Sequence, residues 1–110
     1  MGTTEEFEYT VTRSGAQVTL AVRGELDAAT GPSLSDAVTA LSSDGVARLV
    51  IDLDHVTFVD SRGLSALLES YGAATERDTA FAVVNLQPAV RRLFRITGVD
   101  TLLLDGDAPS

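Results

Sequence analysis

The sequence contains no cysteine and no lysine among its 110 residues. The lack of cysteine excludes a disulfide framework, a thiolate metal site and a cysteine nucleophile, and it agrees with a reducing compartment. The lack of lysine excludes a phosphate-loop lysine, a Schiff base and a receiver-type phosphoaspartate site that relies on a lysine. Several classes of enzyme are therefore excluded before any motif is considered.

Long apolar runs are also missing. No segment approaches the roughly 20 apolar residues that a membrane-spanning helix needs. The N-terminal residues MGTTEEFEY lack the basic start and apolar run of an export signal. We therefore expect a cytoplasmic protein without a membrane segment.

Basic residues are scarce in comparison with acidic ones. Sixteen acidic residues face eight arginines, which gives a net charge of −8. This sign disfavours binding to phosphate backbones, so we expect no direct contact with nucleic acid. The length of the chain and its 45% of hydrophobic residues suit one domain with one core. We expect a single domain over residues 1–110, with flexible ends at about 1–6 and 106–110.

Hydrophobic periodicity predicts an N-terminal hairpin followed by alternating helices and strands. The expected strands cover residues 7–11, 18–22, 49–53, 81–84 and 102–104. The expected helices cover residues 34–41, about 61–71, and 90–97, with Gly98 ending the last. This order requires right-handed crossovers and a partly parallel sheet. The expected fold is α/β, with a mixed central sheet of about five strands, an N-terminal hairpin and about three helices packed on the sheet.

The segment VDSRGLSALL, residues 59–68, most strongly invites a functional interpretation. It places a carboxylate and a hydroxyl, those of Asp60 and Ser61, where a buried strand passes into a helix, and functional sites often form in such places. The alternative is a helix cap, in which one of these side chains accepts hydrogen bonds from free backbone N–H groups, worth about 1 kcal/mol. Spacing alone leaves both interpretations open.

Three blocks of sequence carry a resemblance to a known family. They are RGELDAATGPSL at residues 23–34, LVIDLDHVTFVDSRGLSALL at residues 49–68 and PAVRRLFRITGVD at residues 88–100. Over nearly its whole length the chain resembles the STAS domain family, and within it the stand-alone anti-sigma factor antagonists. The middle block is the most specific of the three. The resemblance implies the STAS fold.

The resemblance also implies a switch between partners. In that family the serine after the aspartate is phosphorylated by a partner serine kinase of the ATP-binding type that is also the anti-sigma factor, and Ser61 stands at this position. The unphosphorylated protein would bind the anti-sigma factor and free the sigma factor, whereas phosphorylation would prevent binding until a serine phosphatase removes the phosphate. The implied partner-binding residues are Glu25, Asp27, Thr30, Asp60, Ser61, Arg62, Gly63 and Leu64. We expect no enzymatic activity, no cofactor and a monomer, with a weak dimer left open.

The sequence departs from the family pattern at two places. Arg62 stands where the antagonists usually carry a small residue, and it could pair with a phosphate, select a kinase or remain a solvated side chain. The chain end, LLLDGDAPS, is too short and too broken by Gly106 and Pro109 for the closing helix that the family often has. The docking surface or the stability is expected to differ accordingly.

Other groups of polar residues have simpler interpretations. A metal site could be suggested by Asp52, Asp54, His55 and Asp60. One histidine and scattered aspartates near a strand end usually form a solvated loop, so we expect no metal. A hydrolase could be suggested by Ser61, His55 and an aspartate, but the G-x-S-x-G elbow is absent.

One basic cluster and one competing function remain. Arg91, Arg92 and Arg95 are expected on the solvent face of the third helix, where they are more often solvated or paired locally than part of a binding patch. The competing function keeps the same fold but makes the chain a constitutive STAS scaffold or ligand-sensing module in a signalling complex. Ser61 would then be only a helix cap.

Overall fold

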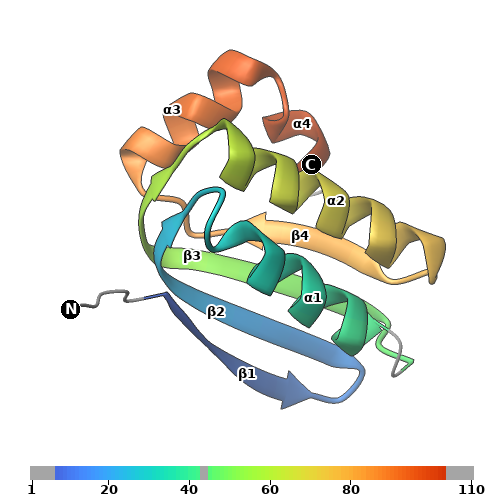
Figure 1. The fold of residues 1–110 in the computed structure, drawn as a ribbon. Helices are drawn as coiled ribbons and strands as arrows, with labels where there is room; N and C mark the ends of the chain where they lie inside the picture. Colours follow the sequence, from blue (N-terminus) through green and yellow to red (C-terminus); the bar gives the residue numbers. More distant parts are fainter. Residues whose placement is uncertain (1–6, 43–44, 104–110) are drawn as a thin grey trace.

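The computed structural model describes residues 7–42 and 45–103, which form a four-stranded sheet with two helices lying across one face (Figure 1). The strands are β1 (Glu8–Ser14), β2 (Gln17–Leu26), β3 (Arg48–Val59) and β4 (Ala80–Val84). The helices are α1 (Gly31–Ser42), α2 (Ser61–Glu76), α3 (Pro88–Thr97) and α4 (Asp100–Leu103). The ends expected to be flexible, residues 1–6 and 106–110, lie outside the described residues.

The sheet has the spatial order β1-β2-β3-β4. The predicted hairpin is confirmed, because β1 pairs antiparallel with β2 around Gly15, which has a φ of 63°. The pairs β2–β3 and β3–β4 are parallel and are connected through α1 and α2. The carboxyl ends of β2, β3 and β4 therefore lie at one edge of the sheet, where the chain passes into α1, α2 and α3.

The core lies between the sheet and the helices. On β3, Leu49, Ile51 and Leu53 are fully buried, as expected of alternate residues that share one face of a strand. The helices contribute buried residues three or four positions apart, namely Leu34, Val38, Leu64, Leu67, Val90 and Phe94. Full burial of a side chain of this size is worth about 1.5–3 kcal/mol. This packing fixes the position of α2 and of its first residue.

The predicted α/β fold is confirmed, but the predicted strand over residues 102–104 is wrong. Gly98 ends α3 as predicted, in the left-handed conformation with a φ of 80°. The chain then forms the single helical turn α4, in which the Leu103 N–H donates to the Val99 carbonyl at 2.9 Å. Leu103 is fully buried, and Leu104 lies outside the described residues. A short apolar run fits a strand or a helix equally well, which is why the sequence pattern misled.

The strand β3 is longer than predicted and contains two irregularities. Its register with β2 shifts between Ala21 and Arg23 and again between Gly24 and Glu25, and each time β3 carries one extra residue. Such β-bulges change the face that the following side chains occupy. The short strand β4 pairs with β3 only as far as Asp52. The second half of β3 is therefore paired with β2 alone.

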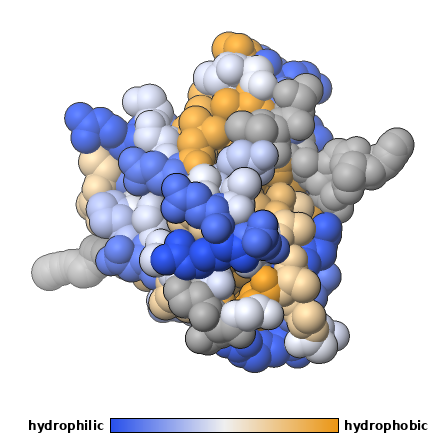
Figure 2. Space-filling view, turned by 90° about the vertical axis from the view of Figure 1, so that its right-hand side faces the viewer, coloured by the Kyte–Doolittle hydropathy of each residue, from blue (hydrophilic) through white to orange (hydrophobic). Residues whose placement is uncertain are grey.

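The surface mixes hydrophilic and hydrophobic residues. Figure 2 shows hydrophobic and hydrophilic residues mixed on one face. Most of the strongly hydrophobic residues lie in the upper part of that view. Among the residues that the structure describes, the large hydrophobic side chains that remain exposed are Tyr9, Val11, Phe58 and Ile96. The arginines predicted on the solvent face of the third helix are indeed exposed, namely Arg91, Arg92 and Arg95. No helix within residues 7–42 and 45–103 combines the length and apolar character needed to span a bilayer.

Candidate functional site

Ser61 is the first residue of α2, and its side chain is exposed. The preceding residue, Asp60, is the N-cap: its backbone is extended, with φ −105° and ψ −172°, and its Oδ1 accepts from the Gly63 N–H at 2.9 Å. The Asp60 carbonyl accepts the Leu64 N–H at 2.9 Å. No hydrogen bond among the described residues uses the Ser61 hydroxyl. The structure thus assigns the cap to Asp60 and leaves the Ser61 hydroxyl open to solvent.

The loop between β2 and α1 is held by its own side chains. Asp27 Oδ1 accepts the Ala29 N–H at 3.0 Å and the Thr30 N–H at 3.1 Å. Thr30 Oγ1 donates to the Glu25 carbonyl at 2.7 Å and accepts the Asp27 N–H at 3.0 Å. These bonds fix the loop in one shape and keep the Asp27 carboxylate at a defined place.

This loop lies directly against the start of α2. The Leu26 carbonyl accepts the Asp60 N–H at 3.2 Å. A Cβ at position 63 would collide with the same carbonyl group, so the close approach requires Gly63. A Cβ at Gly31 would lie 3.0 Å from the Ala66 Cβ, so α1 and α2 also approach closely. The two glycines bring Asp27 and Ser61 to neighbouring positions on one edge of the sheet.

A shallow groove of about 340 Å³ lies between α1 and α2 beside this edge. Three carboxylates line it, those of Asp27, Asp36 and Glu69, together with the single cation of Arg62. The groove is therefore net negative. Arg62 itself is exposed, and no ion pair among the described residues includes it.

The residues implied by the resemblance fall into two groups. Glu25, Ser61 and Arg62 are exposed, whereas Asp27, Thr30 and Asp60 are half-buried and bonded within the loop and the cap. The remaining two, Gly63 and Leu64, are buried. In the free chain these two support the start of α2 and present no side-chain surface.

Sequence reasoning missed one residue near this edge. Phe58 is 47% exposed at the end of β3, and no pattern in the sequence singled it out. No local signal in the sequence marks it, because its outward position depends on a bulge that pairs Phe58, and not Thr57, with Glu25.

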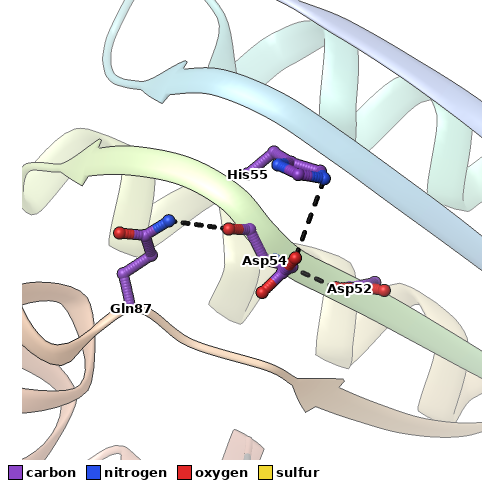
Figure 3. A network of polar contacts seen from close by, with 4 residues as sticks. All are labelled: Asp52, Asp54, His55 and Gln87. Carbon is purple, nitrogen blue, oxygen red and sulfur yellow. Dashed lines mark hydrogen bonds and ion pairs between the residues drawn. The ribbon is translucent and has the colours of Figure 1, made fainter.

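Of the residues considered for a metal or a hydrolytic triad, Asp52, Asp54 and His55 lie on β3, in the network of Figure 3. The others, Asp60 and Ser61, lie at the start of α2. The Asp54 N–H donates to Asp52 Oδ1 at 2.9 Å, and His55 Nε2 lies 3.7 Å from Asp54 Oδ2. The His55 side chain is 68% exposed, and no contact of the described residues joins it to Ser61. Gln87 Nε2 donates to the Asp54 carbonyl at 2.7 Å and so ties the start of α3 to β3. Within the described ranges no three His, Cys, Asp or Glu side chains gather as a metal site would require.

Comparison with known proteins gives the relatives of the chain. The family model described as "Mlab, STAS domain" matches residues 9–105. The anti-sigma-B factor antagonist of Staphylococcus aureus is 32% identical over 82 residues, which are 74% of this chain and 76% of that protein. The crystal structure of an anti-sigma factor antagonist from Mycobacterium paratuberculosis is 35% identical, with a TM-score of 0.79, over 89% of this chain and 83% of that chain.

More distant structures share the fold. The anti-sigma factor antagonist SpoIIAA in its unphosphorylated form has a TM-score of 0.75 at 17% identity, over 88% of this chain and 86% of that chain. The Bacillus SpoIIAA in its phosphorylated form has a TM-score of 0.68 at 16% identity, over 88% of this chain and 89% of that chain. Since the family model covers most of the sequence and the relatives agree with it, this chain belongs to the STAS domain family.

Proposed function

We propose that the chain is a cytoplasmic anti-sigma factor antagonist whose binding is switched at Ser61. Unphosphorylated, it binds an anti-sigma factor that is also an ATP-binding serine kinase, and the sigma factor is released. Phosphorylation of Ser61 breaks this complex, and a serine phosphatase restores it. The chain acts as a binding protein and not as an enzyme, in agreement with relatives that are named as antagonists of anti-sigma factors.

One observation carries the proposal: the Ser61 hydroxyl is exposed at a helix start that it does not cap. Asp60 makes the capping bond to the Gly63 N–H, so a structural reason for a serine at position 61 is missing. A kinase needs a hydroxyl that is accessible and free of strong internal bonds. The competing interpretation, a constitutive scaffold, is left without a capping role for Ser61, because the neighbouring aspartate makes that bond.

The position also explains how a phosphate could act. It adds about −1.5 to −2 charges, and at the first residue of α2 it meets free N–H groups and the positive end of the helix dipole. The domain should therefore accept it without refolding, and SpoIIAA has this fold in both its unphosphorylated and phosphorylated forms. A partner packed over Ser61 would have to desolvate the phosphate beside the carboxylates of Asp27 and Asp60. Release follows from this cost at the interface.

The test is a pull-down from native lysate with wild-type, Ser61→Ala and Ser61→Asp baits, with bound proteins and the phosphate on Ser61 identified by mass spectrometry. We expect wild type and Ser61→Ala to hold an ATP-binding serine kinase and Ser61→Asp to lose it. Phosphate should appear on Ser61 of the wild-type bait when ATP is present.

The matched control is Ser14→Asp, which adds the same charge at an exposed serine. Ser14 pairs with Gln17 at the opposite end of β2, about 30 Å from Leu26 along the strand. This variant should bind like wild type. Equal partners on all baits, with no phosphate on Ser61, would point instead to a constitutive scaffold.

A further inference from the structure

Phe58 is an exposed aromatic residue near Ser61, and it has no role in the switch proposed so far. It is 47% exposed, whereas its neighbours Val56 and Val59 are buried. An aromatic ring exposed singly is common on protein surfaces. Here, however, a β-bulge in the backbone directs the ring to the solvent side of the strand.

The outward position of Phe58 results from the second bulge of β3. Val56 pairs with Gly24, but the next β2 residue, Glu25, pairs with Phe58, so Thr57 is the extra residue. In a regular strand with Val56 facing the core, Phe58 would also face the core, because alternate residues share a face. The bulge reverses this: Val59 enters the core and Phe58 faces solvent. Bulges that re-aim a side chain are frequent beside functional sites.

Phe58 stands three residues before Ser61 and lies beside the carboxylate of Glu25. Three residues of extended chain span at most about 11 Å, which limits the distance between the Cα atoms of Phe58 and Ser61. Glu25, exposed, is its direct neighbour on β2. Because β4 pairs only with the first half of β3, no strand covers the other side of this segment within the described residues. We call Glu25, Phe58 and Ser61 the switch surface.

We propose that Phe58 is the apolar anchor of the switch surface and inserts into an apolar pocket of the anti-sigma kinase, with a basic residue of that pocket facing Glu25. The inference rests on the proposed function and specifies the chemistry of its partner. Interfaces have an apolar centre with a polar rim, and a buried aromatic side chain often carries much of the affinity. The exposed ring supplies such a centre, and Glu25 supplies a rim charge whose natural counterpart is a cation.

The test uses the kinase recovered in the pull-down above, purified as a recombinant protein, with affinities measured by biolayer interferometry. All chains carry Ser61→Ala so that phosphorylation cannot interfere. Phe58→Ala should weaken binding about 30-fold, chiefly through faster dissociation. Phe58→Tyr, which keeps the ring, should restore most of the affinity. The matched control is Ile96→Ala, because Ile96 is 74% exposed on α3 and should change the affinity less than about twofold.

The outcomes separate the inference from the proposed function. If Phe58→Ala binds as tightly as its parent while Ser61→Asp still fails to bind, the anchor is wrong and the switch stands. If no kinase is captured even by Ser61→Ala, the proposed function fails and the anchor fails with it. Unfolding curves check that Phe58→Ala retains its fold, and a second variant, benzoylphenylalanine at position 58, should crosslink to the kinase under light. Absence of that crosslink with a bound kinase would also overturn the anchor.

Discussion

Gly63 determines how closely α2 approaches the end of β2. Its φ is outside the left-handed region, so glycine is needed here for space and not for backbone conformation. The sequence suggested Gly63 only through a resemblance. Its reason, a contact with the Leu26 carbonyl, joins residues far apart in the chain and cannot be recognised from local pattern.

Gly63→Ala should lower the free energy of unfolding by about 1–3 kcal/mol, because the new methyl group must displace backbone. The matched control is Gly72→Ala in the same helix, where a Cβ would meet nothing within 4 Å. That substitution should raise stability by about 0.5–1 kcal/mol, as alanine favours helix. Urea unfolding measures both, and changes of the same sign would contradict the packing described.

For the helix α2, the sequence pattern predicts the helix but not the residue that caps it. The spacing of Leu64, Leu67 and Leu68 predicted a helix starting near Ser61, and this is confirmed. The pattern could not choose the cap, because Asp60 and Ser61 both carry a suitable oxygen. The choice depends on the backbone: Asp60 is extended and reaches the third N–H of the helix, while Ser61 is already helical.

Asp60→Ala should therefore cost about 1 kcal/mol of stability, the usual value of a lost N-cap. Ser61→Ala should change stability by at most a few tenths of a kcal/mol, since the hydroxyl makes no bond and alanine suits a helix. Thermal unfolding of the two variants tests this assignment. A loss of equal size in Ser61→Ala would make the serine the cap after all.

The other elements also divide into those that the sequence pattern predicts and those that it does not. The hairpin, the central position of β3, the strand β4 and the end of α3 at Gly98 follow from alternation, apolar runs and glycine chemistry. The bulges of β3 do not, because an extra residue leaves the composition of a strand unchanged and only alters which side chains face the core. For the same reason the exposure of Phe58 was not predicted. The turn of α4 was missed because its apolar run is too short to show a period.

The described residues form one frame around a single hydrophobic cluster, and the chain carries a strongly negative charge. One hydrophobic cluster joins residues from the sheet and from all four helices. The net charge of −8 becomes more negative on phosphorylation, and this change is confined to one edge of the sheet. We therefore expect phosphorylation to change the structure only near Ser61.

Ser61→Asp should accordingly leave the structure intact. In amide spectra of the isotopically labelled protein, shifts should be limited to the β2–α1 loop and the first turns of α2. The matched variant Ser14→Asp should shift only the β1–β2 turn. Large shifts on α3 or β1 in the Ser61→Asp protein would show refolding and would remove the argument for repulsion at the interface.

The close contact of Gly63 with the Leu26 carbonyl has a consequence for timing. Because the loop and the helix start are joined by this contact and by the hydrogen bond from Asp60 to Leu26, we expect no slow rearrangement of this segment before a partner binds. In the proposed switch, the observed association rate should rise in proportion to partner concentration without reaching a plateau. The rate of the response is then set by the rates at which the kinase phosphorylates Ser61 and the phosphatase dephosphorylates it. No conformational step of the antagonist limits it.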